Sequence, residues 1–273
     1  MSRRQSERVG HYNTVVYMHL TTLVLLLALL PVLTPSIAVT PFVGSMLVAA
    51  GIVNFFAFAY LYRALSRGVV SVVAPIAYTY PVVTTVLSVL LLGVELSPDR
   101  IATIGCIIVG VVLLSTRFSE LRELLGKNLP KLTKGVGAAM ASSLLFGIVY
   151  VAVAYATPVA GYVLPVVFLR GVGTVAGFLA APVFHESVRP SKSAFSKIIM
   201  AMGGLEALGF LSFSYGFTLG ASAIPIVAAL SGMGGAVASS YALIFLRERL
   251  EMNQLLGLVL SLAGVFILLY VGG

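Results

Sequence analysis

Charged residues are scarce in this sequence. Asp, Glu, Lys and Arg together make up 10% of its 273 residues, against roughly a quarter in an average soluble domain. A water-soluble protein of this size could not cover its exterior with so few polar groups, and the mean hydropathy of +1.07 agrees with this. The composition therefore excludes a soluble domain, and most of the surface must face lipid.

Cysteine, histidine and enzyme signatures are scarce too. The single Cys106 excludes a disulfide framework and a cysteine-based metal site, and the three histidines form no metal-binding pair. Gly126-Lys127 lacks the upstream glycine of a phosphate-binding loop, so we expect no ATP-driven pumping by this chain. Ala229-Leu230-Ser231-Gly232 resembles the serine motif of an intramembrane protease, but no later helix carries an activating histidine. The sequence thus predicts neither an enzyme nor a cofactor.

Basic residues are in excess, with a formal net charge of +8. They lie in short gaps between apolar runs, which is typical of a membrane protein and not of a nucleic-acid-binding face. Of the 17 Lys and Arg, Arg100 lies in a gap on one side of the predicted membrane and Arg170 lies inside an apolar run. All the others fall on the opposite side, which the positive-inside rule assigns to the cytoplasm together with the N-terminus.

Nine apolar runs are long enough to cross a bilayer core of about 30 Å, which needs roughly 20 helical residues. They cover residues 14–33, 42–62, 68–94, 97–116, 135–156, 159–184, 198–220, 221–246 and 252–271. Prolines such as Pro75 and Pro81 lie inside some runs, and kinked helices are tolerated in membranes. The sequence predicts an all-α, multi-pass protein of the cell membrane.

The chain is a tandem repeat. Shifted by a little over half its length, Gly51 falls on Gly204, Tyr62 on Tyr215 and Glu95 on Glu248. Five runs separate the two tyrosines, and an odd number places the two halves in opposite orientations. We predict an inverted repeat with residues 1–116 as the first half, 117–134 as a connector and 135–273 as the second half. The run at 135–156 has no partner in the first half.

The connector has apolar residues among mixed charges. This pattern fits a short helix lying at the lipid surface, and it fits a solvated linker equally well.

Two charges inside the predicted membrane are the main functional candidates, because such charges are costly there. Arg170 lies roughly 16 Å from the outer end of its helix and Glu206 roughly 12 Å from the inner end of the next. An ion pair at the midplane would offset their desolvation. We expect either a pair that only fixes packing, or a site in which Glu206 carries a proton or binds an amine while Arg170 faces a carboxylate.

Two neutral polar residues occupy the repeat-equivalent positions. His19 aligns with Arg170 and could assist proton coupling, although its place near the helix start favours a side chain that snorkels to the interface. Asn54 aligns beside Glu206 and could bind a ligand or clasp two helices.

Two helices are predicted to be interrupted at corresponding positions. Tyr78 and Tyr80, with their flanking prolines, break one helix, and Ser231 with nearby glycines breaks the other. Corresponding interruptions point to a transporter's binding site, while close packing and lipid-belt tyrosines are the alternatives.

Two stretches also resemble a known family. The stretch from Ala64-Leu65-Ser66-Arg67-Gly68 through Tyr80-Pro81 to Glu95-Leu96-Ser97-Pro98 is similar to the EamA repeat of the drug/metabolite transporter superfamily. Leu246-Arg247-Glu248-Arg249-Leu250, followed by Gln254-Leu255-Leu256-Gly257, resembles the end of a second copy.

The resemblance implies ten helices in two inverted halves around a central cavity. It also implies export or exchange of amino acids, other metabolites or toxic compounds, driven by an ion gradient or by the solute's own gradient. The first helix of the family is missing, so either the true start lies upstream or this is a nine-helix member. Family members usually have both termini in the cytoplasm, whereas the charge distribution here places the C-terminus outside.

We therefore expect a secondary transporter of a small metabolite, with the lipid bilayer as its surroundings and a proton or another ion as a possible coupled partner. The alternative is a membrane-embedded enzyme acting on lipid-linked substrates. Small residues on the helices at 97–116 and 252–271 could support a homodimer or pack within one chain: Gly105, Gly110, Gly257 and Gly264.

Overall fold

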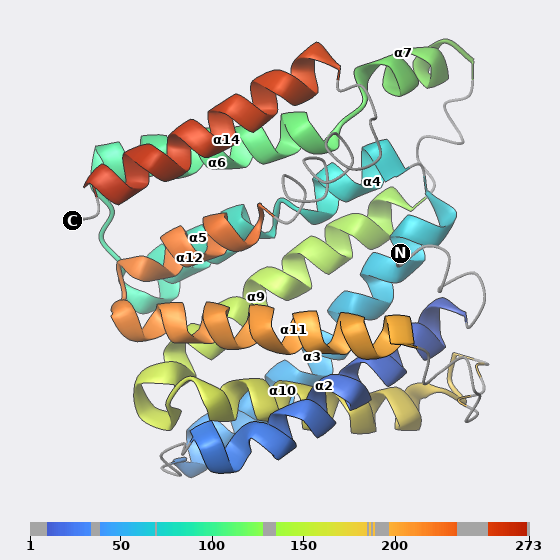
Figure 1. Ribbon diagram of the computed structural model, residues 1–273, viewed down its shortest axis with the longest axis vertical. Coiled ribbons are helices and arrows are strands. Elements are labelled where there is room, and N and C mark those ends of the chain that lie inside the picture. Colours follow the sequence, from blue (N-terminus) through green and yellow to red (C-terminus); the bar gives the residue numbers. More distant parts are fainter. Residues whose placement is uncertain are drawn as a thin grey trace.

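The computed structural model describes residues 10–33, 39–68, 70–127, 135–184, 186, 188, 197–233 and 251–271. Within these ranges the regular structure is helical throughout, as the sequence predicts (Figure 1). The helices are α2 (His11–Leu33), α3 (Pro41–Arg67), α4 (Val70–Ala77), α5 (Tyr80–Leu92), α6 (Pro98–Ser115), α7 (Phe118–Lys127), α9 (Val136–Ala160), α10 (Val163–Ala180), α11 (Lys197–Gly216), the 3-10 turn η1 (Phe217–Leu219), α12 (Ala223–Ser231) and α14 (Met252–Val271).

Six segments of the described chain are long and apolar enough to cross a membrane. They are Tyr12–Leu33, Pro41–Arg67, Val72–Leu92, Val136–Ala160, Val163–Ala180 and Lys197–Leu219. Helices α6 and α14 account for two more predicted runs, and the run at 221–246 is described only as far as Met233. Large apolar side chains such as Val32, Leu90 and Leu179 are more than two-thirds exposed, as lipid-facing residues are. The chain is a multi-pass membrane protein.

Local sequence sets several helix ends. Thr40 caps the N-terminus of α3 by accepting a hydrogen bond from the Val43 amide at 3.3 Å, and Pro41 occupies the first turn. Helix α9 ends at Gly161, whose φ of 71° suits a residue without a side chain. The predicted span 159–184 was therefore wrong at its start, since α10 begins only at Val163.

The predicted break near Tyr78 is present. Helix α4 ends at Ala77, a turn covers Tyr78 and Thr79, and Pro81 lies in the first turn of α5. The Thr79 hydroxyl lies 2.7 Å from the Ile76 carbonyl and 3.0 Å from the Ser143 hydroxyl of α9. These contacts satisfy polar groups that the interrupted helix would otherwise leave unpaired in lipid.

Helix pairing agrees with the repeat. In the repeat, α2 corresponds to α10 and α3 corresponds to α11. Helix α2 packs on α11, and α10 packs on α3 in the corresponding way. Helix α5 packs on α12, and α6 on α14, as Figure 1 shows at the upper edge of the bundle. Helix α9 packs on both α3 and α5.

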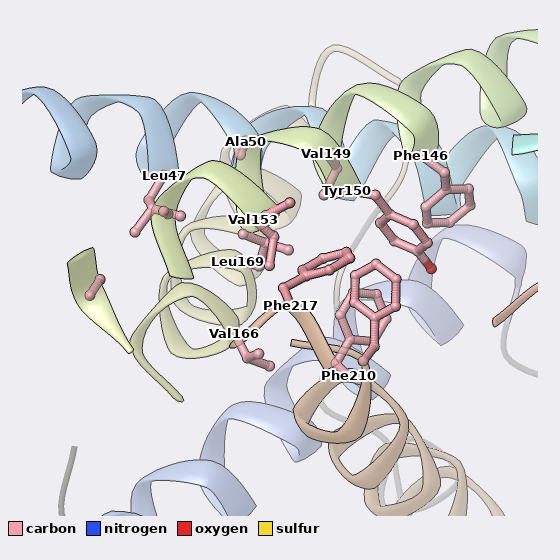
Figure 2. Packing of buried hydrophobic residues seen from close by; sticks show 14 of the residues in the cluster. Leu47, Ala50, Phe146, Val149, Tyr150, Val153, Val166, Leu169, Phe210 and Phe217 are labelled. Carbon is pink, nitrogen blue, oxygen red and sulfur yellow. The ribbon is translucent and has the colours of Figure 1, made fainter. Parts of the chain in front are cut away.

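The main apolar core lies where α3, α9, α10 and α11 meet. Figure 2 shows residues of this cluster: Leu47, Ala50, Phe146, Val149, Tyr150, Val153, Val166, Leu169, Phe210 and Phe217. Aromatic rings of α9 and α11 point toward one another in it, so this side of the core is lined by rings and not by aliphatic chains.

Helices α6 and α14 pack closely against each other at glycine residues. A Cβ atom added at Gly110 would lie 2.6 Å from the Ser261 amide nitrogen, and one at Gly264 would lie 2.6 Å from Ile107 Cγ1. The side-chain amides of Asn253 and Gln254 donate to carbonyls at the C-terminal end of α6, at 2.8–3.1 Å. Gly110, Gly257 and Gly264 therefore pack within one chain, while Gly105 faces open space.

The connector begins with α7, so a short helix, one of the two alternatives left open by the sequence, is present at its start. The Ser119 amide, in its first turn, donates to Glu251 Oε2 at 3.0 Å. The Ser119 hydroxyl also donates to Glu251 Oε1, and these two hydrogen bonds lower the pKa of the Glu251 carboxyl. The rest of the connector, residues 128–134, lies outside the described residues.

We predict that Gly110→Ala destabilises the protein, because the added methyl group would meet the α14 backbone. Overpacking of this kind typically costs about 1–3 kcal/mol. Thermal unfolding in detergent would show a lower Tm. Gly105→Ala is the matched control on the same helix, because its methyl group meets no atom within 4 Å; equal Tm values for the two variants would contradict the predicted backbone contact.

Candidate functional site

Arg170 of α10 is fully buried and is the largest side chain without solvent exposure in the described chain. Its Nη1 lies 2.8 Å from Nε2 of His19, 3.1 Å from Oδ1 of Asn54 and 3.1 Å from Oε1 of Glu206. The four side chains come from α10, α2, α3 and α11. All four residues were candidates from the sequence, and the fold brings them into one cluster, which we call the charged cluster.

The repeat explains this convergence. His19 is the repeat equivalent of Arg170, and Asn54 aligns beside Glu206. Helices α2 and α10 contact each other, and each also contacts α3 and α11. Residues in equivalent places of the two halves therefore meet where the halves join, which is where sites lie in transporters built from inverted repeats.

Glu206 has a second partner that the sequence analysis missed. Its Oε2 accepts a hydrogen bond from the Thr22 hydroxyl at 2.8 Å, and that hydroxyl also lies within 3.0 Å of the Met18 and Gly203 carbonyls. The spacing offered a signal, because Thr22 follows His19 by three residues and so shares its face of α2.

The expected snorkelling of His19 is wrong. Its side chain is fully buried, because α2 crosses α10 at this level and the ring is enclosed by Phe55 and Phe58. Its Nδ1 lies 3.0 Å from the Val15 carbonyl, which can only accept, so Nδ1 carries the proton. Nε2 is then free to accept from Arg170, which assigns a neutral imidazole to this position.

Aromatic rings cover the guanidinium group of Arg170. Its Cζ lies 4.0 Å from the ring centre of Phe210 and 5.3 Å from that of Phe58. Cation–π contacts of this kind stabilise a desolvated cation. They also leave the polar edge of the guanidinium group, and not its faces, available for hydrogen bonds.

Several polar atoms of the charged cluster are not hydrogen-bonded. Among the described residues, Nε and Nη2 of Arg170, Nδ2 of Asn54 and Oε1 of Glu206 have no hydrogen-bond partner. The 3.1 Å contact of Glu206 Oε1 with Arg170 is an ion pair without hydrogen-bond geometry. Each buried unsatisfied group costs about 1–3 kcal/mol, so a cluster of four indicates a place for a polar ligand.

Tyr80 and Ser231 form a second, separate contact between the start of α5 and the end of α12. Their hydroxyls lie 3.0 Å apart. The Ser231 hydroxyl donates to the Ala228 carbonyl at 2.7 Å, so Tyr80 is the donor between the two. Tyr78 joins neither group and packs half-buried against apolar residues of the core. The glycines after Met233 lie outside the described residues.

Aromatic side chains connect the two groups. The ring centres of Tyr80 and Tyr150 lie 5.0 Å apart, those of Tyr150 and Phe210 lie 6.1 Å apart, and Phe210 covers Arg170. Figure 2 shows Tyr150, Phe146 and Phe210 side by side in the core. The interrupted helices therefore contact the charged cluster through rings of α9 and α11.

The charged cluster is enclosed. Arg170 has no exposed surface and the side chain of Glu206 is 8% exposed. Three cavities in the described part of the chain, on α3, α9 and α10, are lined by neither residue.

We predict that Thr22→Val lowers stability, because it removes the only hydrogen bond to the Glu206 carboxylate among the described residues. Hydrogen bonds to charged groups contribute about 1.5–3 kcal/mol. Thr103→Val, which loses only a bond to the Asp99 carbonyl of its own helix, is the matched control. Similar melting curves for wild type and Thr22→Val in detergent would show that this bond contributes nothing.

Comparison with known proteins agrees with the fold and the repeat. A family model described as EamA-like transporter family matches residues 1–116 and 133–270. A solved crystal structure of a protein superposes with a TM-score of 0.75 at 16% sequence identity, over 99% of this chain and 91% of the other. That likeness supports the fold alone. No curated protein matches the chain in sequence.

Proposed function

We propose a function from two facts: the chain belongs to the EamA-like transporter family, and it buries four polar atoms without a hydrogen bond in one charged cluster. The family consists of membrane transporters of small molecules. The function that the cluster supports best is transport of a small zwitterionic metabolite, such as an amino acid, by alternating access.

The unpaired atoms are the observation that carries this proposal. Arg170 offers two donors, Nε and Nη2, and a guanidinium edge binds a carboxylate through two parallel hydrogen bonds. Glu206 offers one acceptor, Oε1, which suits an ammonium group. A molecule with both groups on adjacent atoms would satisfy both residues at once, and Asn54 Nδ2 could donate to the carboxylate as well.

The rings around the charged cluster set the shape of the substrate. Phe58, Phe210 and Tyr150 surround the guanidinium side of the cluster, which favours a compact substrate with a small or apolar side chain. A large polar solute would leave its own groups unsatisfied against these rings.

Alternating access would use the two halves as moving bodies. The charged cluster lies where they join, and we expect bending at the turn between α4 and α5, where α5 packs on α12. Opening on one side separates α2 from α11, and opening on the other separates α3 from α10, by the symmetry of the pairing. Export or exchange, the direction implied by the family resemblance, is the direction that we propose.

Proton coupling would act through Glu206. Protonation removes its charge and with it the 3.1 Å ion pair with Arg170. A proton and a substrate ammonium group would then compete for the Glu206 carboxylate. Such competition is required for a transporter that exchanges protons for substrate. His19 is positioned as a hydrogen-bond acceptor for Arg170 and does not compete for this role.

We predict that Glu206→Gln abolishes counterflow, because the amide cannot pair with an ammonium group. The measurement is uptake of labelled amino acids and other metabolites by proteoliposomes preloaded with the same unlabelled compounds, with and without a pH gradient. We expect at least a tenfold loss for Glu206→Gln and a similar loss for Arg170→Gln.

Glu95→Gln is the matched control, since it makes the same chemical change at an exposed position. Elution of each variant as a monodisperse species shows that it has folded. Wild-type flux in a well-folded Glu206→Gln variant would remove this residue from the mechanism. Flux of neutral or cationic solutes in preference to zwitterions would contradict the proposed substrate class.

A membrane-embedded enzyme is the second candidate, and the geometry does not favour it. Ser231, the one motif serine, is held by the Ala228 carbonyl and the Tyr80 hydroxyl, neither of which is a general base. The buried charges lie in a different cluster, around Arg170.

A further inference from the structure

A cavity of about 290 Å³ lies at the basic end of the bundle, outside the charged cluster. Its lining includes Tyr12 from the start of α2, Tyr60, Arg63 and Arg67 from the last turns of α3, and Glu186 beyond α10. This end carries the positive charge that the positive-inside rule assigns to the cytoplasm. The cavity therefore lies at the level of lipid headgroups.

The two arginines are available for a ligand. Arg63 and Arg67 are four residues apart and share one face of α3. They also line a second hollow, formed with Gly135 and Ala138 at the start of α9. Both side chains are exposed, and neither forms an ion pair or hydrogen bond with another described residue. The one acidic residue in the first cavity, Glu186, leaves a net positive charge there.

An apolar groove continues from this cavity along the outside of the protein. It has a volume of about 780 Å³ and lies between α3 and α10. Its lining is wholly apolar and includes Val48, Ile52, Val172 and Val175. Phe56 lines both the cavity and the groove, so the two adjoin at this side chain.

The groove is long enough for an acyl chain of one bilayer leaflet. Its lining on α10 extends from Val167 to Ala180, which is roughly 20 Å at 1.5 Å per residue. One leaflet of the hydrocarbon core is about 15 Å thick. Beside the groove the two helices approach closely, since a Cβ atom added at Gly51 would lie 2.7 Å from Val172 Cβ.

We propose that this surface binds an anionic phospholipid of the inner leaflet. The phosphate lies against Arg63 and Arg67, and one acyl chain lies in the groove between α3 and α10. The arginines provide positive charge for an anionic headgroup. The adjoining groove provides apolar surface for an acyl chain, which a soluble anion does not have. A lipid here would bridge α3 and α10, one from each half of the repeat, at their exposed seam.

Lipid titration by native mass spectrometry of the full-length protein tests the proposal. Delipidated protein is titrated with phosphatidylglycerol and, separately, with phosphatidylcholine of the same acyl chains. We expect wild type to prefer phosphatidylglycerol. The double variant Arg63→Gln/Arg67→Gln should lose this preference, with affinity falling about fivefold for each arginine removed. Arg100→Gln, at the opposite end of the bundle, should bind as wild type does.

A variant of the groove distinguishes binding of a lipid from binding of a free anion. Ala176→Phe fills the groove, so it should weaken full-length phosphatidylglycerol and leave dihexanoyl phosphatidylglycerol unaffected. The double variant Arg63→Lys/Arg67→Lys keeps the charge and should retain the preference for phosphatidylglycerol. It tests the role of charge even where the glutamine variant does not fold. Equal binding of the two headgroups, or displacement of phosphatidylglycerol by millimolar inorganic phosphate, would overturn the proposal.

Discussion

The buried cation of Arg170 is the constraint on which the rest of the structure depends. A charged residue at the centre of a membrane helix costs about 2.5–3.5 kcal/mol on insertion scales, and the rings of Phe58 and Phe210 offset only part of this cost. The carboxylate of Glu206 must therefore lie within contact distance, and it does at 3.1 Å. This single requirement brings α10 and α11 together and leaves room for α2 and α3 beside them.

The two kinds of close contact in the molecule have different roles. At α6 and α14, glycines let backbone meet backbone, and side-chain amides satisfy the end of a helix, so polar groups there are paired. At the charged cluster, donors and an acceptor stay unpaired although they are buried. A protein that needed only stability would satisfy those groups, as it does at α6. This difference is the reason why we propose the charged cluster, and not the contact of α6 with α14, as the ligand site.

Much of the candidate site could be predicted from sequence, because charges in apolar runs are rare. Arg170 and Glu206 stood out for this reason, and the repeat alignment added His19 and Asn54. The burial of His19 could not be predicted, since distance from a helix end says nothing of which neighbour covers it. Thr22 was missed because threonine is unremarkable in a membrane helix until its partner is known. Tyr78 was included only because it lies near the break, which gave no information on the direction of its side chain.

The sequence by itself determined that this is a multi-pass helical membrane protein of two related halves, because hydrophobic run length and repetition are properties of the chain alone. It also determined where a helix must break, since proline and the residues beside it act locally. Only the tertiary structure decided which helices meet: that α2 packs on α11 and α10 on α3, and that a histidine, an asparagine and a glutamate meet one arginine. Packing partners in lipid are chosen by shape and by polar contacts between distant segments, and no local pattern in the chain contains that information.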